Sequence, residues 1–106
     1  MKNIVVFASG SGSNFQSIID AVKRGDIPAR ITGLISNKPD IGAIERADKE
    51  NIPSRVINPD SLSEDSDFDE ILLSQLLEWK ADLIVLAGYL KKIPSGIIKK
   101  YPNRIL

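Results

Sequence analysis

The chain has 106 residues, of which 42% are hydrophobic and 26% are charged, and its formal net charge is zero. This length fits one compact domain, and the zero net charge gives no reason to expect binding to nucleic acid or to a membrane surface. The chain contains neither cysteine nor histidine, which excludes disulfides and the commonest metal ligand. No apolar run approaches the roughly 20 residues of a membrane span, and we expect a cytoplasmic protein without a metal site.

The first half of the chain predicts strands that alternate with helices. Residues 4–8 form a short, β-branched run bounded by glycine and serine, which is typical of a buried strand. A helix that ends at Gly25 follows, because apolar residues recur at helical spacing: Phe15, Ile18, Ile19 and Val22. Residues 30–36 predict a second strand, and Asp40 is the expected N-cap of a helix that reaches about Asn51.

The second half continues the alternation. Residues 54–58 predict a third strand and residues 61–67 a polar loop. Ser66 with Asp69 resembles a capping box. The helix that it opens has one apolar face, and that face is expected in the core: Phe68, Ile71, Leu72, Leu76 and Trp79.

The last third predicts a strand at residues 83–87, a short helical turn after Pro94, and the start of a fifth strand at residues 104–106. Apolar strands that alternate with amphipathic helices indicate an α/β fold. We expect three αβα layers around a Rossmann-like, mostly parallel sheet of four strands plus the start of a fifth. Ligands of such sheets bind beyond the carboxyl ends of the strands, where residues 9–14, 36–40 and 88–94 should lie.

The loop at residues 9–14, Ser-Gly-Ser-Gly-Ser-Asn, joins a strand end to a helix start. The first amides of a helix have no intrahelical partner, and glycine lets the backbone approach an anion closely. The loop therefore predicts a phosphate site. Phe15 stands where a dinucleotide fingerprint needs its third glycine, and no Walker A lysine follows. The alternative is a tight turn with a capped helix and no ligand.

Four segments in order resemble phosphoribosylglycinamide formyltransferases: "NIVVFASGSGSNFQSIIDA", "SNKPD", "ADLIVLAGYLKKIP" and "YPNRIL". The resemblance covers residues 2–106. It implies transfer of a formyl group from 10-formyltetrahydrofolate to glycinamide ribonucleotide, a step of de novo purine biosynthesis. In this family, the residues that match Gly12, Ser13 and Asn14 hold the substrate phosphate. The folate pocket is lined by the residues that match Leu90, Lys91, Lys92 and Ile93.

Two positions depart from the family pattern. Lys91 stands where the family commonly has arginine, so that a point charge replaces a planar guanidinium. Asp65 stands where the family often has a folate-contacting arginine, and because the charge is reversed no binding role is assigned to it. Without the resemblance, the Lys91–Lys92 pair would be interpreted as a solvated charge pair.

The resemblance implies that residues 1–106 are a single amino-terminal, nucleotide-binding subdomain. The family's Asn-x-His segment and its aspartate carry the transfer, and both are expected beyond Leu106. We therefore expect no turnover from these 106 residues alone, and a homodimer through the exposed sheet edge.

Two other classes of function stay open. One is a sibling enzyme, because formyltetrahydrofolate hydrolase and methionyl-tRNA formyltransferase share this domain type. The other is a non-catalytic domain that binds phosphate but no folate, which a folate titration would distinguish.

Overall fold

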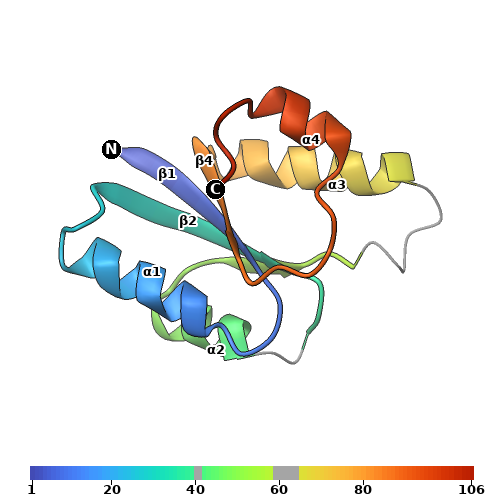
Figure 1. Cartoon of the computed structure of the whole chain (residues 1–106). Helices are drawn as coiled ribbons and strands as arrows, with labels where there is room; N and C mark the ends of the chain where they lie inside the picture. The colour runs from blue at the N-terminus through green and yellow to red at the C-terminus, as the bar shows by residue number, and fades with distance from the viewer. Residues whose placement is uncertain (40–41, 59–64) are drawn as a thin grey trace.

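The computed structural model describes residues 1–39, 42–58 and 65–106. Strands and helices alternate from one end of the chain to the other (Figure 1). The elements are β1 (Lys2–Ala8), α1 (Ser13–Lys23), β2 (Ala29–Ser36), α2 (Gly42–Lys49), β3 (Ser54–Val56), α3 (Asp65–Glu78), β4 (Leu83–Ala87) and α4 (Ser95–Lys100).

The four strands form one parallel sheet in the order β3-β2-β1-β4. β1 lies in the middle, and its five buried residues in a row reflect a strand covered on both faces. Beyond β4, Ile105 pairs in parallel with Ile84, and Leu106 exchanges backbone hydrogen bonds with the same strand. The predicted parallel sheet and the start of a fifth strand are both confirmed.

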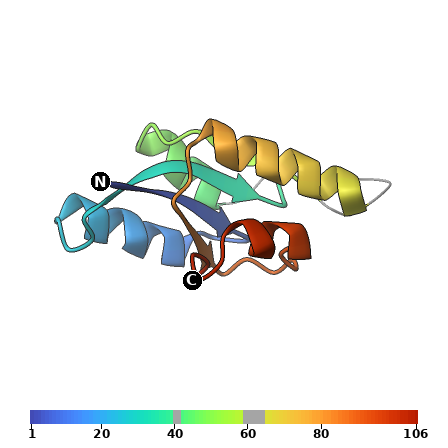
Figure 2. The same ribbon diagram turned by 90° about the horizontal axis from the view of Figure 1, so that it is seen from above.

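Helices cover both faces of the sheet, which gives the expected three layers (Figures 1 and 2). On one face α1 and α2 pack through Phe15, Ile19 and Ala43 against the sheet. On the other face α3 and α4 enclose a second core with Phe7 and Ile35 at its centre. The alternation of faces along β1 explains this division, because Val6 enters the first core while Phe7 enters the second.

The predicted apolar face of α3 is confirmed. Phe68, Leu72 and Leu76 are buried in the second core, and the half-buried side chains of Ile71 and Trp79 pack against it. Trp79 lies against β2, because a Cβ placed on Gly33 would overlap the indole ring. The expectation that Trp79 serves packing is therefore confirmed.

Two predicted boundaries around the third strand and the helix that follows it differ from the structure. β3 ends at Val56 and not at residue 58, although the amide of Ile57 still donates to the carbonyl of Ser36. The capping box at Ser66 was wrong, because α3 already includes Asp65. The backbone of residues 65–67 is therefore helical, where a loop was predicted. The N-cap predicted at Asp40 and residues 61–64 of the predicted loop lie outside the described residues.

Candidate functional site

The first loop, defined as residues 9–14, turns sharply from β1 into α1. Gly10 and Gly12 take φ angles of 90° and 80°, in the left-handed region that favours glycine. Gly12 also approaches α2 closely: a Cβ there would lie 2.6 Å from the Cα of Ala43. The Nε of Arg46 donates to the carbonyl of Ser11 over 3.0 Å. The loop is therefore held against α2 by a close backbone contact and by a hydrogen bond.

The amides at the start of α1 are open to a ligand. Gly12 is the N-cap residue, and no side chain caps the helix. Within the described residues, the amides of Ser13 and Asn14 donate no hydrogen bond, and both residues are exposed. Unpaired amides at the positive end of a helix dipole form a suitable environment for an anion.

The side chain of Ser9 connects three strand ends. Its hydroxyl donates to Oδ1 of Asn37 over 2.5 Å, and it accepts a hydrogen bond from the amide of Leu90 over 3.2 Å. Asn37 follows β2, Ser9 follows β1, and Leu90 lies in the loop after β4. The three segments predicted at the carboxyl edge of the sheet are thus brought together, and the prediction for their placement is confirmed.

The loop after β4, residues 88–94, lies beside the first loop. Gly88 has a φ of 74°, and a Cβ placed on it would lie 3.7 Å from Nδ2 of Asn14. Leu90 is 78% exposed, whereas Ile93 is buried in the second core. Leu90 and the exposed Lys92 therefore present side chains to solvent, while the side chain of Ile93 serves packing.

Tyr89 is directed into the protein. Its ring makes an edge-to-face contact with Phe7, with 5.2 Å between the ring centroids. Its hydroxyl is buried and has no hydrogen-bond partner among the described residues. Burial raises the pKa of Tyr89 to about 12. At neutral pH the loop after β4 is thus anchored by a neutral phenol.

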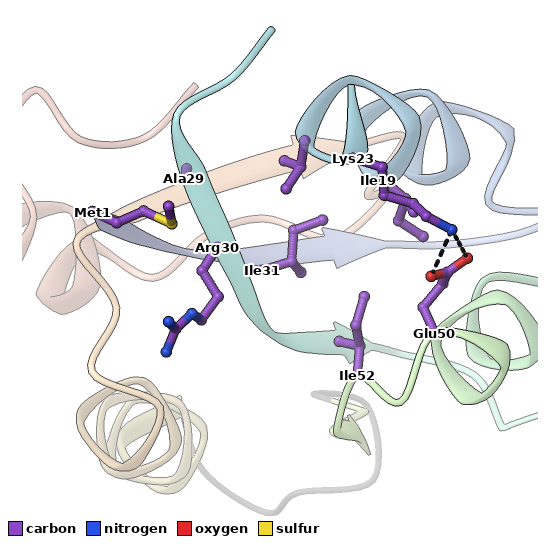
Figure 3. Close-up of a pocket in the computed structure, with 9 residues that line it drawn as sticks. Met1, Ile19, Lys23, Ala29, Arg30, Ile31, Glu50 and Ile52 are labelled. Atoms are coloured by element: carbon purple, nitrogen blue, oxygen red, sulfur yellow. Dashed lines mark hydrogen bonds and ion pairs between the residues drawn. The ribbon is translucent and has the colours of Figure 1, made fainter. Parts of the chain in front are cut away.

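A separate hollow of about 340 Å³ lies toward the amino ends of β1 and β2, away from the first loop (Figure 3). Its floor is apolar, and the Lys23–Glu50 ion pair, 3.0 Å long, crosses its rim. The residues that line it are Met1, Ile19, Val22, Lys23, Ala29, Arg30, Ile31, Glu50 and Ile52. None of the predicted site residues lines this hollow.

The predicted set of residues 12–14 and 90–93 lies at one edge of the sheet, but sequence reasoning missed the two residues that join them. Ser9 and Asn37 each follow a predicted strand, but the sequence does not show that β1 lies between β2 and β4, which is what brings them together. Among the described residues, no group of three or more acidic side chains could hold a metal ion. In the same part of the chain, no helix is long and apolar enough to span a membrane.

Comparison with known proteins matches nearly the whole chain to formyltransferases. The family model described as Formyl transferase matches residues 2–106. The phosphoribosylglycinamide formyltransferases of Haemophilus influenzae and Bacillus subtilis are 41% and 36% identical over the whole chain, which covers 50% and 54% of their lengths. The chain thus spans about half the length of these relatives.

Two solved structures show the same similarity in three dimensions. Glycinamide ribonucleotide transformylase 1 from Geobacillus kaustophilus superposes with a TM-score of 0.93 and is 43% identical; the match covers 99% of this chain and 56% of that one. Phosphoribosylglycinamide formyltransferase from Bacillus halodurans gives a TM-score of 0.94 at 33% identity, over 98% of this chain and 54% of that one. The chain therefore belongs to the formyl transferase family.

Proposed function

We propose that this chain supplies the phosphate-binding loop and part of the folate pocket of a phosphoribosylglycinamide formyltransferase. The reaction transfers a formyl group from 10-formyltetrahydrofolate to the amine of glycinamide ribonucleotide in de novo purine biosynthesis. One observation supports this most strongly: the Ser9 hydroxyl joins the first loop to the loop after β4. Two different substrates can therefore meet at one edge of the sheet.

The ribonucleotide phosphate binds at Gly12, Ser13 and Asn14 in this proposal. Unpaired amides at the start of α1 donate to its oxygens, and the side chains of Ser13 and Asn14 add further donors. The absence of a Cβ at Gly12 keeps this loop close to α2. The phosphate fixes one end of the substrate and leaves its amine free to reach the formyl donor.

The folate lies against residues 90–93 in this proposal. The exposed side chain of Leu90 offers an apolar surface to the pterin. Lys91 and Lys92 supply positive charge, and Lys91 stands where the family commonly has arginine. Burial of Ile93 in the second core supports a role for its backbone, with its side chain as the anchor of the segment.

The chemical step needs groups that residues 1–106 do not contain. The substrate nitrogen attacks the formyl carbon, its proton leaves, the bond from that carbon to N10 of the folate breaks, and N10 takes up a proton. A general base must remove the first proton, and a donor must stabilise the oxyanion. The chain has no histidine, which is the side chain that most often serves as a general base. We propose that the transferring groups lie outside these 106 residues.

A formyl-transfer assay on the intact natural protein that carries this chain tests the proposal. Asn14→Ala should raise the KM for glycinamide ribonucleotide by about tenfold or more, because it removes a donor to a charged oxygen. Ser74→Ala, a position on α3 away from both loops, is the matched control and should leave it unchanged. Residues 1–106 expressed alone should show no turnover.

Folate binding separates the alternatives. Binding of phosphate without folate would indicate a non-catalytic domain, and formate release without glycinamide ribonucleotide would indicate a hydrolase. A cytoplasmic location stays a prediction of the sequence.

A further inference from the structure

We infer that Ser9 is a positioning residue for the folate: its hydroxyl holds the backbone of the loop after β4 at the distance from the first loop that the cosubstrate requires. This inference rests on the proposed function and deepens it. Ser9 acts through the amide of Leu90, with which it shares a 3.2 Å hydrogen bond.

The orientation of the Ser9 hydroxyl is determined by Asn37. A serine hydroxyl has one proton to donate and two lone pairs with which to accept. The proton is directed to Oδ1 of Asn37, whose residue is only 4% exposed. The lone pairs are then left for the amide of Leu90, which can only donate. The two hydrogen bonds therefore form a directed chain from Leu90 through Ser9 to Asn37.

The two loops depend on this pair of hydrogen bonds to different degrees. The first loop has other support, since Gly12 packs against Ala43 and Arg46 donates to the carbonyl of Ser11. The loop after β4 is anchored at Tyr89 and Ile93 by their side chains, whereas the side chain of Leu90 is exposed and its amide is held by Ser9. Loss of the Ser9 hydroxyl should therefore displace the backbone around Leu90, between the anchors at Tyr89 and Ile93, and leave the phosphate site in place.

This difference predicts a selective effect on binding. In the intact natural protein, Ser9→Ala should weaken the binding of 5-formyltetrahydrofolate by about fivefold to tenfold, the amount expected for one lost hydrogen bond. The affinity for inorganic phosphate should stay within about twofold of the wild type, a difference too small to reflect a lost hydrogen bond. Ser9→Thr keeps a hydroxyl and should restore folate binding.

Isothermal titration of each variant with the two probes is the measurement. Thr32→Val is the matched control, because it removes another half-buried hydroxyl, bonded over 3.4 Å to the carbonyl of Ile4, on a different part of the sheet. It should change neither affinity. Asn37→Ala is a second test, since it frees the hydroxyl proton while Ser9 stays in place. It should weaken folate binding and spare phosphate binding, also where Ser9→Ala does not fold.

The outcomes separate this inference from the proposed function. Equal folate affinity of wild type, Ser9→Ala and Asn37→Ala would overturn the positioning role alone. A parallel loss of folate and phosphate binding would indicate general support of the fold and would overturn it as well. A wild-type protein that binds phosphate but no folate would contradict the proposed function, and the inference with it.

Discussion

Gly12 allows the first loop to run against α2 because it has no Cβ. Gly10 shares its left-handed backbone but faces open space, with no atom within 4 Å of the position that a Cβ would occupy. The two glycines therefore separate two effects that usually occur together, backbone strain and steric overlap. At this scale the sequence predicted the positive φ angles of the two glycines, but it did not predict that Gly12 would pack against α2.

Gly12→Ala should destabilise the fold more than Gly10→Ala. The left-handed φ costs each variant about 1–2 kcal/mol. Only Gly12→Ala places a methyl group 2.6 Å from the Cα of Ala43, which should add about 1–3 kcal/mol of overpacking. Urea unfolding of both variants measures the difference. Equal losses of unfolding free energy would show that the contact with α2 is not tight.

Tyr89→Phe should be more stable than the wild type at pH 7, and the difference in the free energy of unfolding should grow at alkaline pH. The buried hydroxyl has no hydrogen-bond partner among the described residues, so its removal should raise the free energy of unfolding by about 1 kcal/mol. The pKa of Tyr89 is raised to about 12 in the folded chain, against about 10 in an unfolded one. Between pH 10 and pH 12 the unfolded chain loses this proton while the folded chain keeps it. The free energy of unfolding of the wild type is therefore unaffected by the ionisation of Tyr89 below pH 10 and falls as the pH rises toward 12.

Unfolding free energies from pH 7 to 11 test this prediction. The gap between Tyr89→Phe and wild type should widen above pH 10. The pKa of Tyr101 is raised by burial too, so Tyr101→Phe is the control that shows how much of the alkaline loss belongs to the other buried phenol. Parallel curves for wild type and Tyr89→Phe would contradict the assignment.

At the scale of elements, apolar patterning predicted most of the architecture. β4 has the predicted bounds, and α3 buries the predicted face, because both elements contribute residues to the same core. The prediction failed at residues 65–67, where acidic residues were interpreted as loop although they also favour a first helical turn. The link from Ser9 to Leu90 was beyond sequence reasoning, because it depends on which strands become neighbours.

The packing of α3 on β2 gives a test at this scale. Gly33→Ala should destabilise the fold by about 1–3 kcal/mol, because its Cβ would overlap the ring of Trp79. Trp79 is the single tryptophan, so its fluorescence reports the displacement. In a double-mutant cycle, Trp79→Leu should remove most of the cost of Gly33→Ala. Additive effects would mean that the two residues do not touch.

At the scale of the whole molecule, apolar side chains are exposed beside β4. Leu86, Ile98 and Leu106 are 37%, 51% and 72% exposed, and Leu106 lies next to Leu86 through a backbone hydrogen bond. Apolar surface at a sheet edge promotes pairing between chains. The family relationship was predictable from the sequence because the four matching segments are spread over the whole chain.

We propose that residues 1–106 expressed alone form a homodimer through this edge. A two-fold symmetric dimer is the commonest form of such association. Sedimentation velocity at about 100 μM, where exposed apolar surface drives association, should show a dimer. Leu106→Lys should shift the equilibrium toward monomer by adding like charges across the symmetric contact. A clean monomer for the wild-type chain would refute the proposal.

In the proposed function, the first loop binds the phosphate of glycinamide ribonucleotide. Titration of the ¹⁵N-labelled chain with this ribonucleotide, followed by amide chemical shifts, tests it most directly. We expect saturable shifts at Gly12, Ser13 and Asn14, and their reversal by excess inorganic phosphate. Saturable shifts confined to the hollow toward the amino ends of β1 and β2, around Met1 and Arg30, or no shift in the first loop, would contradict it.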